Sequence, residues 1–550
     1  MRKKELKQNS FLNGAFVATM GIVITKVLGM LYVIPFYAII GEQGGALYGY
    51  AYTIYLLFQS LSCAGIPNAI SKIISEYQTL GYSKAKEKAF KIGRRLAVFM
   101  GIFVFIILFL FAPIIAKAII GDLTGGNTLS DVTYVIRVIA TAILVVPILS
   151  IYRGYLEGHK FITPTAISQV VEQVARIVVI IAGSYAALNV FHLSLTTAVG
   201  VATFGATAGA LIGYLYLLDK VFKHKKEINN ITEVKDEPVI STKEILGKIF
   251  FYALPFIMID VFKSAYNFVD MTTLVKTLVH SAGYTTVAAE NSMSVISTWG
   301  NKLNMIIVSI STGIIISLIP NLTSSSVKGD KKDVHHKINQ TLQILLFLSV
   351  PMTIGLSFLS QPVWDVFYGN KSAVGAEIMA YYIFVALIIS TYTALVSIVQ
   401  VLKYYKEVFI SLFAGVLIKV LTNVYLIKAF YGLGLQPVYG SITATILGYL
   451  VGIVLCLYYL KKKCGVSYKP TIRIMGKIII ADIIMILSLF LVKFVVPISS
   501  SVRLLNIPII LVYTIIGAGI YLLASYKSGV IEEVLGSKML AKIKRKVAKK

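Results

Sequence analysis

The strongest constraint on this chain is the length of its apolar runs. Residues 11–40, 96–120 and 378–402 are long enough to cross a lipid bilayer, which takes about 20 residues in a helix. Only 14% of the 550 residues are charged, whereas about a quarter are charged in a typical soluble domain. This pattern excludes a soluble enzyme and a disordered or fibrous chain. It predicts an all-α polytopic membrane protein.

The apolar runs predict about fourteen membrane spans. Several are longer than the minimum, so we expect tilted, kinked or extended helices. The predicted spans are residues 11–40, 46–71, 96–120, 132–152, 161–187, 195–218, 249–275, 294–319, 338–363, 378–402, 407–430, 438–460, 475–496 and 504–526.

The basic residues give an independent test of this count. If both termini are cytoplasmic, 39 of the 52 Lys and Arg residues lie in the predicted inside segments and only 3 lie in the outside loops. This asymmetry is typical of cytoplasmic loops. It also accounts for the net charge of +27, because the cations flank anionic lipid head groups and need no nucleic acid partner. For residues 530–550, an amphipathic helix on the inner surface and a solvated tail are both open.

Two six-span blocks resemble each other. Gly65-Ile-Pro-Asn68 closes the second span as Leu318-Ile-Pro-Asn321 closes the eighth, and Gly213-Tyr214 corresponds to Gly448-Tyr449. Six spans is an even number, so the repeats are parallel, and two such lobes suit an alternating-access transporter. The expected parts are an N-lobe at 1–220, a cytoplasmic linker at 221–247, a C-lobe at 248–465, two further spans within 466–526, and a basic cytoplasmic tail at 527–550.

Ionisable residues inside the spans are the most informative local feature. A cation at the centre of a bilayer costs about 2.5–3.5 kcal/mol on insertion scales, so these side chains are expected to face the protein interior or a wet cavity. The deep cations are Lys26, Arg176, Lys263, Lys302 and Lys419, and the deep acids are Glu172, Asp260, Asp270 and Asp482.

Some of these charges are spaced for pairing along a helix. Glu172 and Arg176 are four residues apart, and Asp260 and Lys263 are three apart, so structural neutralisation and a functional role are both open. The second pair belongs to a longer polar stripe on one helix face, which favours a cavity lining that could also serve ion coupling. The stripe consists of Asp260, Lys263, Asn267 and Asp270.

Three deep lysines, Lys26, Lys302 and Lys419, have no acidic residue within one helical turn. Gly21 and Gly29 flank Lys26 and allow a helix or a ligand to approach it closely. Such cations predict an anionic ligand, although Lys302 could instead extend its amine to the outer surface. The chain has no phosphate-binding Gly-x-x-x-x-Gly-Lys-Ser/Thr loop and no metalloprotease motif, so we expect a transporter without ATPase activity, cofactor or metal.

The N-terminal sequence resembles a known family. The stretches Gly14–Tyr37, Gly44–Tyr50 and Ala64–Lys72 are similar to the YtgP-type, MurJ-like flippases of Gram-positive bacteria, within the multidrug/oligosaccharidyl-lipid/polysaccharide exporter superfamily. The span count, the repeat and the two additional C-terminal spans agree over essentially the whole chain. At Tyr32-Val33 the chain departs from the Gram-negative branch, which has an Arg-Asp pair there, so that branch's charge network does not transfer directly.

The resemblance implies a flippase that moves lipid II, the undecaprenyl-pyrophosphate-linked peptidoglycan precursor, from the inner to the outer leaflet. It implies that a cationic cavity receives the pyrophosphate, with Lys26 and Lys302 matching the family's basic positions. Together with the residues, it predicts an anion site of Lys26, Lys263, Lys302, Arg176 and Lys419. Glu172, Asp260, Asn267 and Asp270 are the polar or coupling candidates.

Together, the sequence and the resemblance predict a monomeric, multi-pass protein of the bacterial plasma membrane. Its partners are a lipid-linked oligosaccharide, anionic membrane lipids and cell-wall synthesis proteins, and an ion gradient or the membrane potential drives it. Two alternatives stay open: a flippase for another polyprenyl-linked polysaccharide precursor, including a sporulation type, and a cation-coupled multidrug exporter of the same superfamily. The second would need an acidic cavity, whereas the deep residues here lean basic, five to four.

Overall fold

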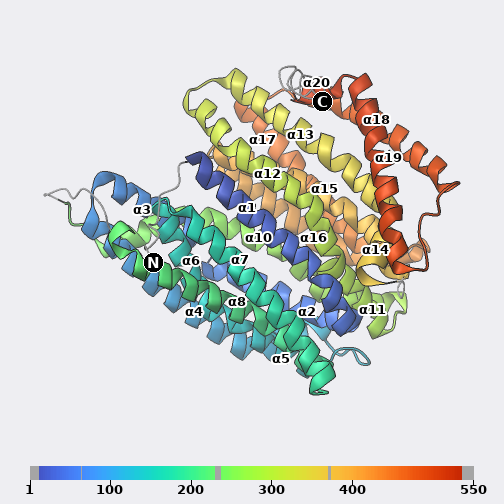
Figure 1. Cartoon of the computed structure of the whole chain (residues 1–550), viewed down its shortest axis with the longest axis horizontal. Helices are drawn as coiled ribbons and strands as arrows, with labels where there is room; N and C mark the ends of the chain where they lie inside the picture. Colours follow the sequence, from blue (N-terminus) through green and yellow to red (C-terminus); the bar gives the residue numbers. More distant parts are fainter. Residues whose placement is uncertain (1–10, 64, 229–236, 370–372, 536–550) are drawn as a thin grey trace, which may run out of the picture. The chain divides into compact units, whose positions relative to one another are not determined.

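A computed structural model describes residues 11–63, 65–228, 237–369 and 373–535 (Figure 1). Within these ranges the regular secondary structure is entirely helical, which confirms the predicted all-α class. Eleven of the described helices are long and apolar enough to cross a membrane, or twelve if a pair bent by 47° near Tyr32 counts as one span. The count of fourteen stays a prediction.

The chain divides into two compact units, Met1–Thr298 and Trp299–Lys550. The helices of the first unit are α1 (Phe11–Leu31), α2 (Val33–Cys63), α3 (Ile66–Leu80), α4 (Ser83–Ile120), α5 (Leu129–Ala140), α6 (Ala142–Gly158), α7 (Ile162–Val178), α8 (Leu195–Lys223), α9 (Lys225–Ile228), α10 (Thr242–Ala282) and α11 (Thr286–Ser294). Two π-helical turns, Val179–Gly183 and Ala186–Val190, extend α7.

The second unit contains the remaining helices. These are α12 (Gly300–Val327), α13 (Lys331–Phe358), α14 (Ser360–Tyr368), α15 (Ala373–Val401), α16 (Tyr405–Gly432), α17 (Val438–Cys464), α18 (Lys469–Lys493), α19 (Asn506–Lys527) and α20 (Val530–Leu535). A π-helical turn at Val295–Trp299 leads into α12. The tail predicted beyond residue 535 lies outside the described residues.

Two glycines interrupt the helices where the sequence places span boundaries. Gly41, with φ 65° and ψ −165°, breaks α2 one residue after the predicted end of the first span. Gly65, with φ 72°, separates α2 from α3, and a Cβ atom there would lie 2.6 Å from the carbonyl oxygen of Ala253. A side chain at residue 65 would therefore be strained and would push α10 away from α2.

Small residues bring helices of the first unit into close contact. Gly21 of α1 faces Ala166 of α7, where an added Cβ would lie 3.0 Å from the alanine Cβ. Gly209 of α8 faces the backbone of Glu172, at 2.6 Å from an added Cβ to the carbonyl oxygen. Figure 1 shows α4, α6, α7 and α8 side by side, in agreement with their contacts. This packing fixes the backbone of α7, which carries two of the predicted charged residues.

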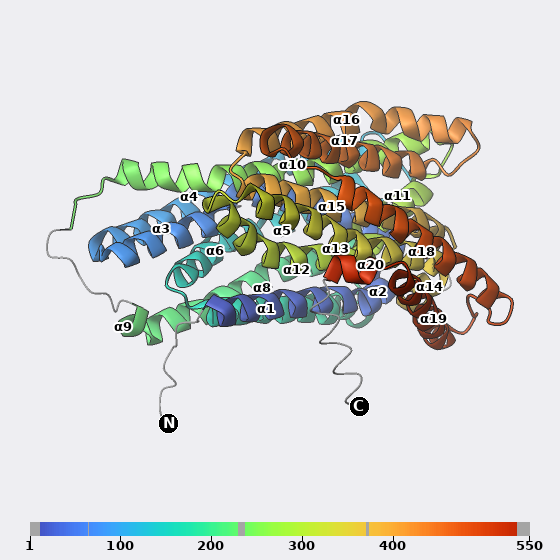
Figure 2. The same ribbon diagram turned by 90° about the horizontal axis from the view of Figure 1, so that it is seen from above.

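In the second unit, α16 and α17 pack closely against each other (Figure 2). A Cβ at Gly440 would lie 2.4 Å from the backbone of Leu426, so glycine is what permits this approach. The C-terminal helices α18 and α19 pack on each other, and α18 also packs on α13. The close pairing of α16 with α17 places the buried Lys419 directly against α17.

Candidate functional site

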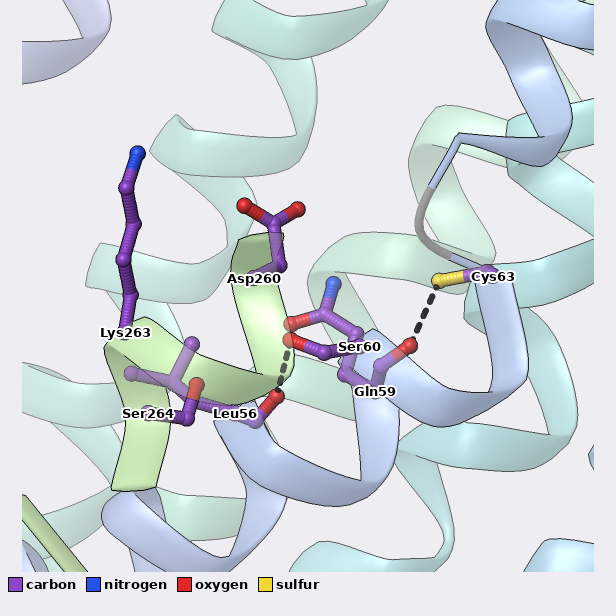
Figure 3. Close-up of a pocket in the computed structure, with 7 residues that line it drawn as sticks. All are labelled: Leu56, Gln59, Ser60, Cys63, Asp260, Lys263 and Ser264. Atoms are coloured by element: carbon purple, nitrogen blue, oxygen red, sulfur yellow. Dashed lines mark hydrogen bonds between the residues drawn. The ribbon is translucent and has the colours of Figure 1, made fainter. Parts of the chain in front are cut away.

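A cavity of about 310 Å³ lies between α2 and α10 (Figure 3). Five of the seven lining side chains are polar or charged, although both helices are largely apolar. The lining residues are Leu56, Gln59, Ser60 and Cys63 from α2, and Asp260, Lys263 and Ser264 from α10.

Asp260 and Lys263 supply the charges of this cavity. Both side chains are half-buried, and they lie close enough for an electrostatic interaction. Within the described part of the chain, however, no hydrogen bond or ion pair within 4.0 Å joins them. On the other wall, the Ser60 hydroxyl donates to the carbonyl oxygen of Leu56, and the Cys63 thiol to that of Gln59. The Lys263 ammonium is thus available to a ligand.

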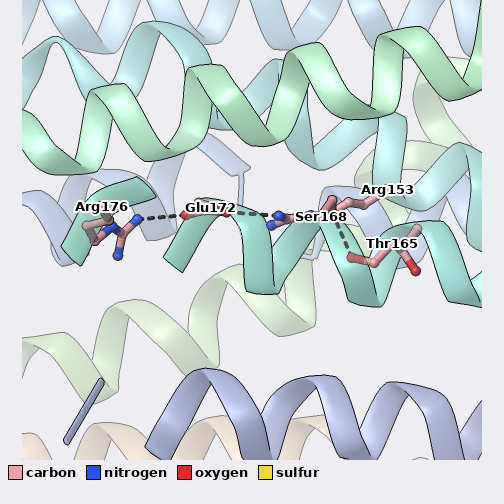
Figure 4. Close-up of polar contacts among 5 residues, drawn as sticks. All are labelled: Arg153, Thr165, Ser168, Glu172 and Arg176. Atoms are coloured by element: carbon pink, nitrogen blue, oxygen red, sulfur yellow. Dashed lines mark hydrogen bonds and ion pairs between the residues drawn. The ribbon is translucent and has the colours of Figure 1, made fainter. Parts of the chain in front are cut away.

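A second charged cluster joins α6 and α7 (Figure 4). Arg153 donates from Nη2 to Glu172 Oε2 at 2.8 Å, and Arg176 donates from Nη2 to Glu172 Oε1 at 2.7 Å. The Nε atom of Arg153 also donates to the Ser168 hydroxyl at 3.0 Å. One carboxylate between two guanidinium groups leaves this Arg–Glu–Arg cluster with one net positive charge. The predicted Glu172–Arg176 pair is confirmed as a pair, with an additional arginine.

The two clusters lie on neighbouring elements. Cys63 is within electrostatic range of both Asp260 and Glu172, so the end of α2 separates the cavity from the Arg–Glu–Arg cluster. Tyr55, about two helical turns before Cys63 on α2, interacts electrostatically with Arg176 and Glu172. The first unit therefore gathers a lysine, two arginines and two acids around one end of α2.

Lys26 lies on α1 and is half-buried. Its flanking glycines contact α7, because an added Cβ would lie 3.0 Å from Ala166 at Gly21 and 3.4 Å from Gln173 at Gly29. In this structure, the two glycines therefore allow close packing of α7 against α1. Lys26 belongs to the stretch of α1 that packs on the part of α7 carrying Glu172, one residue before Gln173.

The other predicted cavity residues are more dispersed. On α10, Asn267 is exposed and Asp270 is buried, and neither belongs to the lining of the α2–α10 cavity. The predicted stripe therefore divides, with its Asp260–Lys263 end at the cavity. Lys302 is half-buried on α12, in the second unit.

Lys419 of α16 is fully buried, with 0% of its surface exposed. Its Nζ atom donates to Asn423 Oδ1 and to the Ser441 carbonyl oxygen, both at 2.9 Å, and to Thr445 Oγ1 at 2.7 Å. Ser441 Oγ lies at 3.4 Å. These acceptors use all three ammonium protons. In this conformation Lys419 is enclosed between α16 and α17, and its place among the predicted cavity cations stays a prediction.

A separate cavity of about 330 Å³ opens among α12, α13, α14, α18 and α19. Its lining is almost entirely apolar, and the contributions of α18 and α19 include Met485, Leu489, Tyr513, Gly517 and Tyr521. Such a surface suits hydrocarbon and offers little to a charged group. Among the described residues, no group of three or more His, Cys, Asp or Glu side chains is arranged to hold a metal ion.

Two features of the site were missed by sequence reasoning. Arg153 counts as a loop residue there, because the fourth span is predicted to end at residue 152, whereas α6 continues to Gly158. Gln59 and Ser60 are uncharged and stand out little within an apolar run. The sequence signal for the α2 wall of the cavity is the presence of two adjacent polar residues, Gln59 and Ser60, inside a predicted span.

Comparison with known proteins places these features in context. Residues 11–324 match the family model described as polysaccharide biosynthesis protein. The lipid II flippase MurJ of Bacillus subtilis (strain 168) is 34% identical over 541 residues, which covers 96% of this chain and 98% of that protein.

Two solved structures show the same fold. A lipid II flippase MurJ in an inward closed conformation superposes with a TM-score of 0.69 at 16% identity, covering 94% of this chain and 99% of that one. A multidrug resistance MATE family transporter in an inward-facing conformation gives 0.62 at 13% identity, covering 82% and 98%. Together with the membrane-spanning helices, these similarities identify a multi-pass bacterial membrane protein with a transporter fold.

Proposed function

Because the chain belongs to the polysaccharide biosynthesis protein family and to its MurJ-like branch, we propose that it is a lipid II flippase. It carries the undecaprenyl-pyrophosphate-linked peptidoglycan precursor from the inner to the outer leaflet and so supports cell-wall synthesis. The observation that carries this proposal is the 34% identity to a lipid II flippase over 96% of the chain. The known relatives of this kind are transporters, and chemistry on the substrate is not part of the proposal.

The charged groups of the first unit support an anionic substrate. The α2–α10 cavity presents Lys263, and the Arg–Glu–Arg cluster beside it has a net positive charge. A pyrophosphate accepts hydrogen bonds from ammonium and guanidinium groups, and such charge-assisted bonds are the strong ones. We assign Lys263 and the neighbouring Arg176 to the pyrophosphate site, together with Lys26 on α1. Lys302 of the second unit is assigned on its match to the family's basic position.

We assign the apolar cavity bounded by α18 and α19 to the lipid tail of the substrate. A polyprenyl chain needs an apolar surface for its isoprenoid units. The lining of this cavity offers methyl, methylene and aromatic groups from five helices. The two spans that follow the internal repeat thereby acquire a function in substrate binding.

The transport cycle that we propose is alternating access between the two predicted lobes. Both termini are cytoplasmic in this scheme, and the protein acts as a monomer. An ion gradient or the membrane potential supplies the drive, with Asp260, Asp270, Glu172 and Asn267 as the polar groups available for coupling. A drug exporter of the same fold would need an acidic cavity for cationic drugs, which the excess of basic groups disfavours.

The test is exposure of lipid II at the outer surface of cells that are depleted of their own flippase and express this chain. Wild-type protein is expected to restore exposure, and Lys263→Ala and the pair Lys26→Ala with Lys302→Ala are expected to abolish it. Lys91→Ala is the matched control, because Lys91 forms an exposed ion pair with Glu87. If the inserted wild-type protein does not restore exposure, lipid II is the wrong substrate. If the lysine variants flip normally, the site assignment is wrong.

A further inference from the structure

Two helices of the second predicted lobe belong structurally to the first compact unit. The sequence repeat begins its second block at residue 248, whereas the compact unit extends to Thr298 and so includes α10 and α11. Alternating access, on which this inference rests, requires the second block to move relative to the first. The contacts that hold α11 in the first unit are therefore candidates for a part that opens and closes.

One buried carboxylate dominates these contacts. Glu290 of α11 is 1% exposed, and its Oε2 atom accepts hydrogen bonds from the backbone N–H and the side-chain amide of Asn127, at 3.0 and 2.9 Å. Asn127 lies in the segment between α4 and α5 and is 5% exposed. Hydrogen bonds to an ionised carboxylate are shorter and stronger than bonds between neutral groups.

The surrounding chain is shaped for this contact. A Cβ at Gly126 would lie 2.6 Å from Glu290 Oε2 and 2.7 Å from the methyl group of Thr286, so the segment approaches α11 as closely as a glycine allows. The Thr286 hydroxyl donates to the carbonyl oxygen of Thr124 at 2.6 Å. Lys276, near the end of α10, donates to the carbonyl oxygen of Ala118 in α4. Three residues of α10 and α11, namely Lys276, Thr286 and Glu290, thus form hydrogen bonds with residues 118–127.

Asn127 also reaches a third element. Its side-chain amide lies 3.4 Å from the carbonyl oxygen of Gln43 in α2. Thr298 donates to the carbonyl oxygen of Gly45 at 2.9 Å. The same side chain that binds Glu290 therefore also connects the segment after α4 to α2, and Thr298, the last residue of the unit, binds α2 two residues further on.

We propose that Asn127 and Glu290 form a latch that holds α11 against the α4–α5 segment and opens once in each transport cycle. Both bonds join one pair of residues, from the backbone N–H and the side-chain amide of Asn127 to the Glu290 carboxylate, so separating the pair requires water to replace both bonds. The predicted topology places both segments on the outer side of the membrane, where water is available. The latch closes the outer end of the substrate pathway while the inner end receives the lipid.

A reversible cross-link tests whether this contact must open. In a variant with Cys63, Cys456 and Cys464 replaced by alanine, Thr124→Cys and Thr286→Cys place two thiols across the contact. The Thr286 hydroxyl lies 2.6 Å from the carbonyl oxygen of Thr124, so the two residues are neighbours across the contact, and the glycine at residue 126 is kept. Oxidation is expected to stop lipid II flipping, and reduction is expected to restore it. Equal flipping in both states would show a static contact and overturn the proposal.

A second measurement does not depend on disulfide formation or on the substrate. In a Thr286→Cys protein, the added Glu290→Gln change should raise the labelling rate by a water-soluble maleimide about tenfold, because the amide cannot accept both bonds as strongly. Glu87→Gln, an exposed change on α4, should leave the rate unchanged. An unchanged rate with Glu290→Gln would overturn the latch. If labelling responds but no variant flips lipid II, the proposed function fails and the latch stands.

Discussion

The buried cationic side chains of the two units have different hydrogen-bond partners. In the first unit, Arg153 and Arg176 bind one carboxylate, Glu172, and all three side chains are 14–17% exposed. In the second unit, Lys419 is completely inaccessible and its ammonium binds an amide oxygen, a carbonyl oxygen and hydroxyl oxygens from α16 and α17. The first arrangement has a counter-ion and remains near a cavity. The second has no counter-ion among these hydrogen-bond partners and is closed.

The difference indicates which charges can serve a ligand. A shared carboxylate leaves each arginine with unused N–H groups, and Nε of Arg176 has no hydrogen-bond partner in the described structure. Lys419 has no unused proton, since three strong acceptors surround Nζ. Charge in a membrane helix therefore does not by itself mark a substrate site. What distinguishes the two cases is whether donors remain free and whether solvent can reach them.

The largest expected effect on stability is that of Glu172→Ala. Removing the carboxylate leaves two largely buried guanidinium groups facing each other, and breaking a buried ion pair from one side costs about 3–5 kcal/mol. Thermal unfolding of the purified protein in detergent measures this loss. Glu87→Ala, which breaks an exposed pair with Lys91, should cost less than about 1 kcal/mol. Equal losses for the two variants would mean that the Arg–Glu–Arg cluster is effectively solvated.

An intermediate effect is expected for Lys419→Met. Methionine has a similar length and removes the charge, so no counter-ion is left behind, but the Asn423 and Ser441 oxygens lose a donor. Losing hydrogen bonds from a charged donor costs about 1.5–3 kcal/mol, and the same thermal unfolding assay should report a loss in this range. Lipid II exposure should be retained in proportion to folded protein. Complete loss of exposure in a fully stable Lys419→Met protein would show that the lysine acts on the substrate after all.

The contrast between the units also shows how far sequence reasoning reaches. Helical class and the approximate positions of the spans follow from apolar runs, because a bilayer requires about 20 such residues whatever their order. The Glu172–Arg176 pair follows from its four-residue spacing on one helix. These features are local, so the sequence contains them directly.

The environment of a charge depends on residues far away in the sequence. Lys419 was predicted to line the cavity because no acid lies within one turn, but its acceptors at Ser441 and Thr445 come from the next helix. Arg153 was assigned to a loop, although it reaches Glu172 nineteen residues later. Contacts between helices decide both cases, and a pattern within one helix cannot reveal them.

The smallest expected effect is that of Thr445→Val, which removes one of the Lys419 acceptors and keeps the side-chain shape. The Thr445 hydroxyl lies 3.2 Å from the Ser441 carbonyl oxygen and donates to it, so it accepts from the ammonium, and losing this one bond should cost about 1 kcal/mol. In the Lys419→Met background the same change should cost less, because the ammonium that it served is gone. A double-mutant cycle by thermal unfolding measures this coupling. Strict additivity would mean that Thr445 stabilises the α16–α17 pair independently of Lys419, and the closed cation site would then consist of Asn423 and Ser441 alone.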